Sequence, residues 1–164
     1  MSHRAKPVAQ SLASVPWNSY SVLQQMTTSL QAQPLAHSIL VVDDEAIPRR
    51  AMERLLSSVG YSVTCAENGE EAWRLFPTAR FHLVITDLRM PVMNGPDLLR
   101  LLRQHVPRMP VLLVSGDSPA RVQGLLTDAI PDAILFKPYP NSELLRMVSH
   151  LLSRVQATGD DKGL

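Results

Sequence analysis

The stretch Ser38-Ile39-Leu40-Val41-Val42-Asp43-Asp44-Glu45 decides the fold of this chain. Four consecutive apolar residues, rich in branched side chains, lead directly into three acidic residues. Such a short apolar run is typical of a strand that is buried on both faces of a parallel sheet. The acidic residues then lie at the carboxyl end of the strand, where open α/β sheets bind their ligands. A second interpretation stays open for this stretch alone, because acidic residues also favour the positively polarised start of a following helix.

From Ser38 to Val155 the sequence alternates between strand and helix patterns. The expected strands are residues 38–42, 62–66, 83–87, 111–115 and 133–136. The expected helices are residues 46–59, 69–76, 96–105, 120–129 and 142–155. Five alternating units predict a single α/β domain, a flavodoxin-like doubly wound sheet of five parallel strands in the order 2-1-3-4-5 with helices on both faces.

The helix boundaries carry further expectations. In the first helix, the apolar side is expected to consist of Ile47, Met52, Leu55, Leu56 and Val59. Gly60 is the residue expected to end that helix, because glycine readily adopts the left-handed conformation found after helix ends. Asn141 is the expected N-cap of the last helix.

Composition limits the class of protein. The chain has 164 residues and a net charge of +1, which gives no electrostatic case for nucleic acid binding. Its one cysteine, Cys65, forms no internal disulfide, and no apolar run approaches the roughly 20 residues that span a bilayer. We therefore expect a cytoplasmic protein without membrane insertion. Residues 1–37 are expected to be a leader, disordered or with one short helix, residues 38–155 the domain, and residues 156–164 a disordered tail.

Polar residues stand at four of the five strand ends. Asp43 and Asp44 follow the first strand, Asp87 ends the third, Ser115 ends the fourth and Lys137 follows the fifth. In the 2-1-3-4-5 order the first and third strands are neighbours, so the three carboxylates are expected to converge. Clustered carboxylates repel one another unless a cation lies among them, and oxygen ligands suit Mg²⁺ or Mn²⁺ better than zinc.

A phosphoryl transfer reaction is the chemistry that these residue types indicate. A lysine and a hydroxyl opposite the carboxylates can bind the oxygens of a transferred phosphoryl group. Asp87 stands alone between the acidic pair and the Ser115–Lys137 side, which makes it the best candidate for the nucleophile. Attack by its carboxylate on phosphorus would give an acyl phosphate.

Four motifs in this order and spacing resemble those of response regulator receiver domains, the phosphorylation modules of two-component signalling. They are Ile39–Glu45, Asp87-Leu88-Arg89-Met90-Pro91 with Met93-Asn94-Gly95, Val114-Ser115-Gly116, and Phe136-Lys137-Pro138. The resemblance covers about residues 37–155 and implies the same 2-1-3-4-5 sheet, which is the strand order of the family.

The resemblance implies a role for each site residue and a magnesium cofactor. It makes Asp87 the phosphoacceptor and a metal ligand, and Asp43 and Asp44 the metal-binding pair. The backbone carbonyl of Arg89 would be a further metal ligand. Ser115 corresponds to the switch hydroxyl and Lys137 to the phosphate-contacting lysine. The Lys137-Pro138 bond is expected to be cis, as it is in the family.

The expected function is that of a free-standing receiver, because no output domain follows Val155. A histidine kinase or phosphotransfer protein would phosphorylate it, and it would act on a protein target without being an enzyme beyond its own phosphorylation and dephosphorylation. The oligomeric state stays open. The alternatives are a receiver segment of a hybrid kinase, a phosphate sink, and a phosphatase of the haloacid dehalogenase type. That last family needs a second acid where this chain has Arg89.

Two positions depart from the family pattern. Ile134 stands where an aromatic residue usually follows the movement of the switch hydroxyl, and Ile130-Pro131 replaces a Gly-Ala pair before the fifth strand. We therefore expect the signal to run through the loop after Ser115 and the start of the fourth helix.

Overall fold

A computed structural model describes residues 37–159, with side chains up to residue 154. Residues 1–36 of the predicted leader and residues 160–164 of the predicted tail lie outside this part of the chain. The predicted domain boundaries therefore stay predictions.

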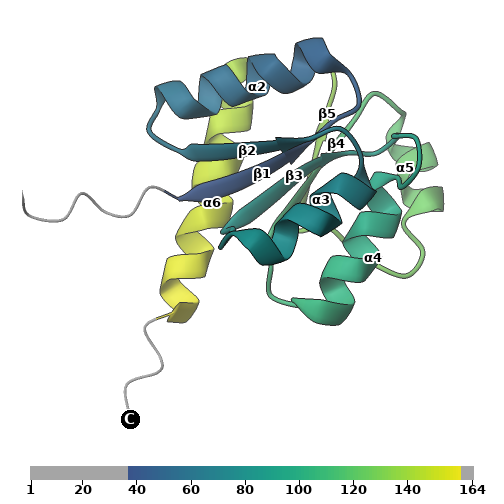
Figure 1. Cartoon of the computed structure of the whole chain (residues 1–164). Helices are drawn as coiled ribbons and strands as arrows, with labels where there is room; N and C mark the ends of the chain where they lie inside the picture. The colour runs from purple at the N-terminus through teal and green to yellow at the C-terminus, as the bar shows by residue number, and fades with distance from the viewer. Residues whose placement is uncertain (1–36, 160–164) are drawn as a thin grey trace, which may run out of the picture. The chain divides into compact units, whose positions relative to one another are not determined.

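The centre of the fold is a parallel sheet of five strands, shown in Figure 1. The strands are β1 (Ser38–Val42), β2 (Ser62–Ala66), β3 (Leu83–Asp87), β4 (Val111–Ser115) and β5 (Ala133–Phe136). They are ordered β2-β1-β3-β4-β5, and Val41 of β1 pairs with Cys65 on one side and Ile85 on the other. The predicted strands and their order are confirmed. Because all strands are parallel, their carboxyl ends share one edge of the sheet.

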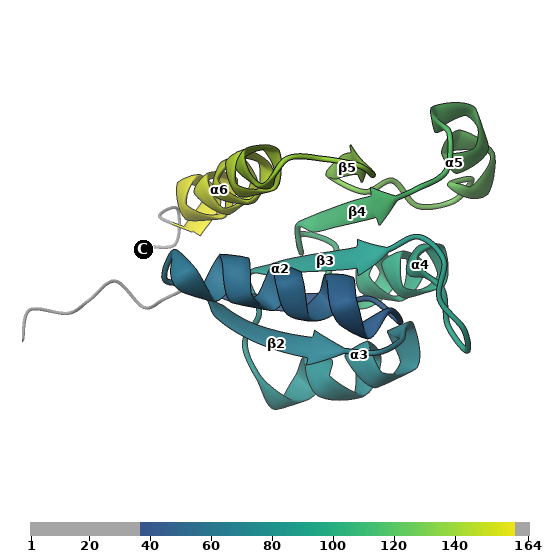
Figure 2. The same cartoon turned by 90° about the horizontal axis from the view of Figure 1, so that it is seen from above.

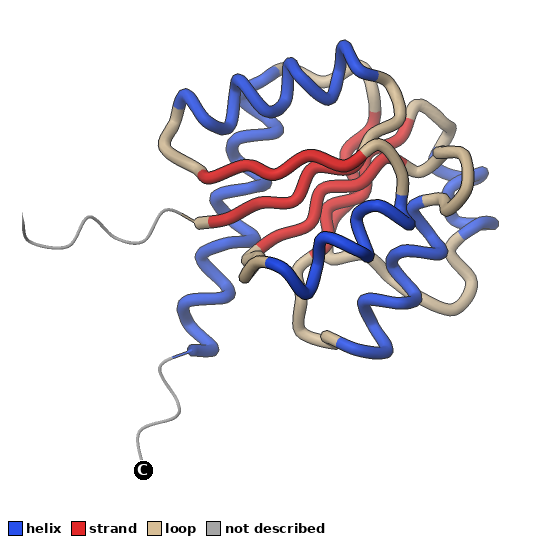
Figure 3. Tube along the Cα trace, viewed as in Figure 1, coloured by secondary structure: helices blue, strands red, loops and turns tan. Residues whose placement is uncertain are grey.

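Helices cover both faces of the sheet. They are α2 (Ala46–Ser58), α3 (Gly69–Leu75), α4 (Gly95–His105), α5 (Pro119–Leu125) and α6 (Asn141–Gly159), with a short 3₁₀ helix η1 (Phe76–Thr78) after α3. Helices α2 and α6 pack on one face and α3, α4 and α5 on the other (Figures 1 and 2). Figure 3 shows that the loops between elements lie at the two ends of the strands.

Burial on both faces explains the continuous apolar run in β1. Ile39 and Val41 belong to the core beneath α2 and α6, whereas Leu40 and Val42 belong to the core beneath α3 and α4. All four side chains are at most 1% exposed. Full burial of such a side chain stabilises the fold by about 1.5–3 kcal/mol, so β1 anchors both cores.

The ends of two helices differ from the sequence prediction. Helix α5 ends at Leu125 rather than at residue 129, and the residues up to Asp132 form a loop. Pro131 disfavours helical backbone at Ile130 but not at residues 126–129, so it does not account for an end at Leu125. Asn141 is the first residue of α6 and not its N-cap, because the Pro140 carbonyl accepts the Glu143 and Leu144 amides. Helix α6 also continues to Gly159, past the predicted end at Val155.

The predicted apolar side of α2 is only partly right. Met52 and Leu56 are buried, but Ile47 is 85% exposed and Val59 is 51% exposed. Ile47 lies five residues before Met52, which turns its side chain well away from the buried face at about 100° per residue. Gly60 follows the helix with φ of 96°, so the predicted glycine after the helix end is confirmed.

The side chain of Arg103 holds the loop of residues 126–132, which follows α5 where a longer helix was predicted. Arg103 of α4 donates to the carbonyls of Ile130 and Met109 at 3.0 and 2.7 Å, and its Nη2 lies 2.7 Å from Asp132 Oδ2. The same Asp132 oxygen accepts the Val111 amide at 2.9 Å. The Ile130-Pro131 segment is therefore held by α4 and β4, which is how this chain accommodates the second departure from the family pattern.

No helix between residues 37 and 159 is long and apolar enough to cross a membrane. Cys65 is partly buried against the α2–α6 core, and burial with the nearby Glu53 charge raises the pKa of its thiol to about 11. This raised pKa fits the packing role of Cys65 rather than a reactive one.

Candidate functional site

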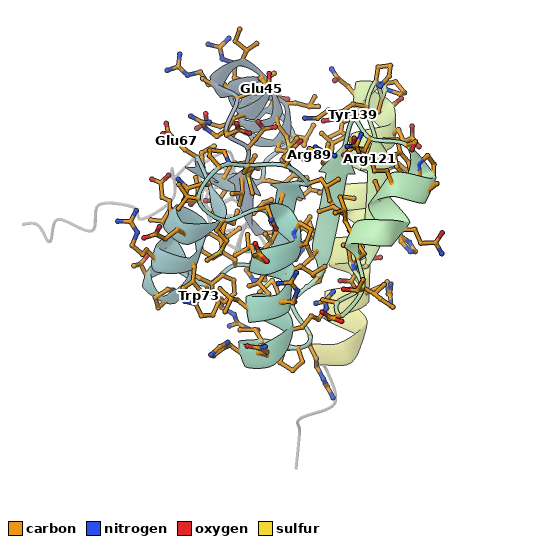
Figure 4. The ribbon with its side chains drawn as sticks, turned by 90° about the vertical axis from the view of Figure 1, so that its right-hand side faces the viewer. Glu45, Glu67, Trp73, Arg89, Arg121 and Tyr139 are labelled. Carbon is orange, nitrogen blue, oxygen red and sulfur yellow. The ribbon has the colours of Figure 1, made fainter. Side chains whose placement is uncertain are left out.

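The predicted site residues meet at the carboxyl-end edge of the sheet. The Asp43–Asp44 pair follows β1, Asp87 ends β3, Ser115 ends β4 and Lys137 follows β5. Figure 4 looks onto this edge, with Glu67 after β2 on one side, Arg89 after β3 near the middle and Tyr139 after β5 on the other side. The sheet order thus brings together residues that are up to 94 positions apart in sequence (137 − 43 = 94).

The ammonium group of Lys137 joins two of the predicted carboxylates. Its Nζ lies 2.6 Å from Asp87 Oδ1 and 3.5 Å from Asp43 Oδ2. Burial lowers the pKa of Lys137, but the hydrogen bond to Asp87 and the charges of Asp87 and Asp43 raise it more, so the pKa lies above its usual value. The Lys137 amide donates to the Ser115 carbonyl at 2.7 Å, and the Lys137–Pro138 bond is cis as predicted.

Asp43 is a buried carboxylate, with a residue exposure of only 2%. Burial raises the pKa of its carboxyl, and the nearby Asp87 charge acts in the same direction. The Glu45 amide, which donates to Asp43 Oδ1 at 2.8 Å, and the Lys137 charge lower the pKa without cancelling the effect of burial. The fold therefore holds Asp43 in a place where its ionised form is disfavoured.

Replacing Asp43 by asparagine is expected to stabilise the metal-free protein by about 1 kcal/mol at neutral pH, because the variant no longer buries an ionised carboxylate. Removing a destabilising functional residue commonly raises stability by this amount. The asparagine oxygen can still accept the Glu45 amide. Because the pKa of Asp43 is raised on folding, the parent gains stability as the pH falls through that pKa toward the unfolded value near 3.8. The advantage of the variant should therefore shrink in acid.

Urea denaturation in EDTA at pH 7 and near pH 4 measures both effects. Asp44→Asn is the matched control, because Asp44 is exposed, and its free energy of unfolding should change by less than about 0.5 kcal/mol. A destabilised Asp43→Asn variant at neutral pH would contradict the prediction.

Arg89 and Asp117 together link Asp87 to Ser115. The Arg89 amide donates to Asp87 Oδ2 at 2.8 Å, and the Arg89 Nε lies 2.6 Å from Asp117 Oδ2. The Asp117 amide in turn donates to the Ser115 hydroxyl at 2.9 Å. Sequence reasoning did not single out Asp117, because an acidic residue two positions after a strand has no distinctive pattern.

Ile134 lies at the position where the family usually has an aromatic side chain. It is partly buried and packs against a small cluster formed by Leu88, Leu113 and Val122. The aliphatic side chain therefore joins the strand β5 to helix α5 through apolar contacts, with no polar group at its tip.

Asp44 differs from the other two carboxylates. It is exposed and lines an open pocket of about 390 Å³, together with Arg89, Asn94 and Leu125 among others. Over residues 37–159, no three Asp, Glu, His or Cys side chains group closely enough to hold a metal ion. The expected convergence of three carboxylates is therefore not found, although Asp43 and Asp87 do meet at Lys137.

The donor set nonetheless fits Mg²⁺. This ion is usually held by one or two carboxylates, with backbone carbonyls, waters or phosphate oxygens as the remaining ligands. Asp43 and Asp87 already approach one cationic nitrogen from two strands, so their oxygens are arranged around a positive charge. A group of three side chains is not required for this metal.

A further residue at this edge, Arg49, was missed by sequence reasoning. It lies in the first turn of α2 and is 9% exposed, which is rare for arginine. Its Nη1 donates to the Asp43 carbonyl, and its Nη2 lies 2.9 Å from Glu67 Oε1. The signal in the sequence was weak, because an arginine in a first helical turn usually lies in solvent.

Comparison with known proteins identifies this arrangement. The family model described as "Response regulator receiver domain" matches residues 39–149. The chain is 39% identical over 118 residues to "Probable transcriptional regulatory protein SilR" of Salmonella typhimurium, covering 71% of this chain and 51% of that protein. It is 33% identical over 133 residues to "Two-component response regulator ORR3" of Oryza sativa subsp. indica, covering 79% of this chain and 100% of that protein.

A solved structure agrees with these sequence relatives. The crystal structure of the response regulator protein TrrA from Thermotoga maritima in complex with Mg²⁺-BeF has a TM-score of 0.63 and 30% identity, covering 70% of this chain and 98% of that one. The chain spans about half the length of SilR and the whole length of ORR3. The chain therefore belongs to the response regulator receiver domain family, and residues 39–149 are a two-component receiver domain.

Proposed function

We propose that the chain is a phosphoacceptor module of a two-component or phosphorelay system, phosphorylated on Asp87. A histidine kinase or a phosphotransfer protein would supply the phosphoryl group, and the phosphorylated domain would act on a protein partner. The observation that carries this proposal is the position of Lys137 Nζ, 2.6 Å from Asp87 Oδ1 and 3.5 Å from the buried Asp43. A lysine in that place can pair with a phosphoryl oxygen as soon as one arrives on Asp87.

The side chains of Asp43 and Asp87 and the backbone carbonyl of Arg89 would hold Mg²⁺, and the exposed Asp44 side chain, which lies apart from the other two carboxylates in this structure, would turn toward the ion when it binds. When bound, the ion supplies the charge neutralisation that phosphoryl transfer requires. The complex of TrrA with Mg²⁺-BeF supports this choice of metal, since that relative is 30% identical to the chain.

The chain's own residues account for the transfer step. An oxygen of the Asp87 carboxylate forms a bond to phosphorus while the bond from phosphorus to the donor imidazole nitrogen breaks, and the imidazole leaves. Lys137 then pairs with a phosphoryl oxygen instead of Asp87 Oδ1. The Ser115 hydroxyl at present accepts the Asp117 amide, so its own hydrogen can be donated to a second phosphoryl oxygen.

The proposed partner class follows from the charge of the chain. A net charge of +1 gives no electrostatic reason for DNA binding by the chain, so a protein target is favoured. A receiver segment of a hybrid kinase or a phosphate sink would use the same chemistry and differ only in its partners.

For the leader, residues 1–37, we propose a role outside the receiver fold, since every site residue lies within residues 38–155.

Mg²⁺ is expected to stabilise the protein by about 2.7 kcal/mol at 100 times its dissociation constant, by mass action on the folded state. The physical reason is that two carboxylates share the charge of one lysine, so a divalent cation adds attraction that the unfolded chain lacks. Thermal melts with Mg²⁺ and with NaCl at the same ionic strength measure the effect. Equal shifts in both salts would mean charge screening and would remove the metal from the proposal.

A further inference from the structure

We propose that Arg49 is a positioning residue for the metal site, holding the Asp43–Asp44 peptide group in the orientation that Mg²⁺ binding requires. This inference rests on the proposed function. It concerns a residue that does not itself touch the metal or the phosphoryl group. Its guanidinium lies between two loops at the carboxyl-end edge, one after β1 and one after β2.

The first step is the contact with Asp43. Arg49 Nη1 donates to the Asp43 carbonyl oxygen, which belongs to the peptide group that joins Asp43 to Asp44. A peptide group is planar, so a fixed carbonyl oxygen also fixes the direction of the Asp44 nitrogen and Cα. The side chain of Asp44 is exposed. Because little packs against the Asp44 side chain, the orientation of the Asp43–Asp44 peptide group sets the direction in which this side chain leaves the backbone.

The second step is the anchor on the other loop. Arg49 Nη2 lies 2.9 Å from Glu67 Oε1, and the Glu67 amide donates to Glu71 Oε2 at 2.7 Å in the first turn of α3. Beside this contact, the Asp43 amide donates to the Ala66 carbonyl at 3.2 Å. The loop after β1 is thus tied to the loop after β2 through both its backbone and the Arg49 side chain.

The third step is the choice of residue. One guanidinium presents several N–H donors in a rigid plane and here reaches two acceptors on different loops, which a lysine ammonium on a flexible stem does less well. The Arg49 side chain is 11% exposed, so its position is fixed by packing, whereas that of Glu67 is 68% exposed. The buried contact to the Asp43 carbonyl is therefore the one that the proposal depends on.

The test is Mg²⁺ binding to the full chain, measured by isothermal titration calorimetry. Residues that orient metal ligands typically change metal affinity by 10–100-fold when replaced, so Arg49→Met should raise the Mg²⁺ dissociation constant about tenfold. Arg50→Met is the matched control, because Arg50 is the next residue of α2 and is exposed. Its dissociation constant should equal that of the parent.

Stability alone does not decide the matter, because loss of a buried arginine also destabilises the fold. A lower melting temperature for Arg49→Met with an unchanged Mg²⁺ dissociation constant would overturn the proposal and leave Arg49 a structural residue. If Arg49→Met does not fold, Arg49→Lys keeps the charge and should still weaken Mg²⁺ binding, and parent-like binding by that variant would likewise overturn it. A parent protein that binds no Mg²⁺ would instead refute the proposed metal site.

Discussion

Asp87→Asn is expected to lose all phosphoryl labelling by a small donor such as acetyl phosphate in the presence of Mg²⁺. An amide has no ionised oxygen to form the acyl phosphate, whereas its shape is close to that of the carboxylate. The parent should gain one phosphoryl group that hydroxylamine removes, because hydroxylamine cleaves acyl phosphates. Intact-protein mass spectrometry before and after hydroxylamine measures both results.

Asp128→Asn is the control for this experiment. Asp128 lies in the loop after α5, with its side chain 73% exposed, and its contact with Arg100 is long at 4.0 Å. The same chemical change there should leave labelling at the level of the parent. Labelling of Asp87→Asn equal to that of the parent would remove Asp87 from the role of phosphoacceptor.

Four of the five strands could be predicted from sequence because they contain short apolar runs, and β2 was predicted from its place in the alternation of strands and helices. The strand order was predicted as the usual one for five such units and from the family resemblance. The run from Ile39 to Val42 has no exposed face, and neither do the corresponding residues of β3 and β4, so a buried parallel sheet was the natural interpretation. The positions of Asp43, Asp87, Ser115 and Lys137 at one edge then followed from strand order alone. Their spacing within that edge did not, because it depends on side-chain conformations.

Two errors at helix ends and one at the site have the same origin. The loop after α5 is held by Arg103, whose contacts join residues far apart in sequence. The start of α6 is capped by the Pro140 carbonyl, a backbone group, whereas the capping pattern in the sequence concerns side chains. The convergence of three carboxylates was inferred from strand order. In the structure Asp43 is buried at the end of its strand while its neighbour Asp44 is exposed, because successive side chains at the strand end point to different sides.

Arg49 and Asp117 show what a local pattern does not contain. The role of each residue depends on the groups that it contacts. Arg49 contacts the Asp43 carbonyl and Glu67. Asp117 contacts the Arg89 side chain and the Ser115 hydroxyl. Nothing adjacent in sequence marks either residue. A single sequence identifies residues that carry chemistry by type, whereas the residues that orient them are visible only once the loops are placed.

Gly95→Ala is expected to lower the free energy of unfolding by about 3 kcal/mol, at the upper end of the range for overpacked cores. Gly95 is buried at the start of α4, where its amide donates to the Leu88 carbonyl at 3.2 Å. A Cβ added there would lie 2.3 Å from the Asp87 carbonyl oxygen and 3.1 Å from Leu113 Cδ1. The first of these atoms belongs to the backbone of β3, so relief requires that the β3–α4 loop shift beside Asp87.

Gly124→Ala provides the matched control, because the same methyl group added in α5 meets nothing within 4 Å. Alanine favours the helix over glycine, so this variant should be more stable than the parent by about 0.5 kcal/mol. Urea denaturation of both variants should therefore give shifts of opposite sign. The shift of the β3–α4 loop in Gly95→Ala should also slow labelling of Asp87 under conditions in which the variant is folded, whereas Gly124→Ala should label at the parental rate. A Gly95→Ala protein as stable as the parent would mean that α4 does not start against the Asp87 backbone in solution, and that the metal and phosphoryl contacts proposed for the β3–α4 loop do not depend on this packing.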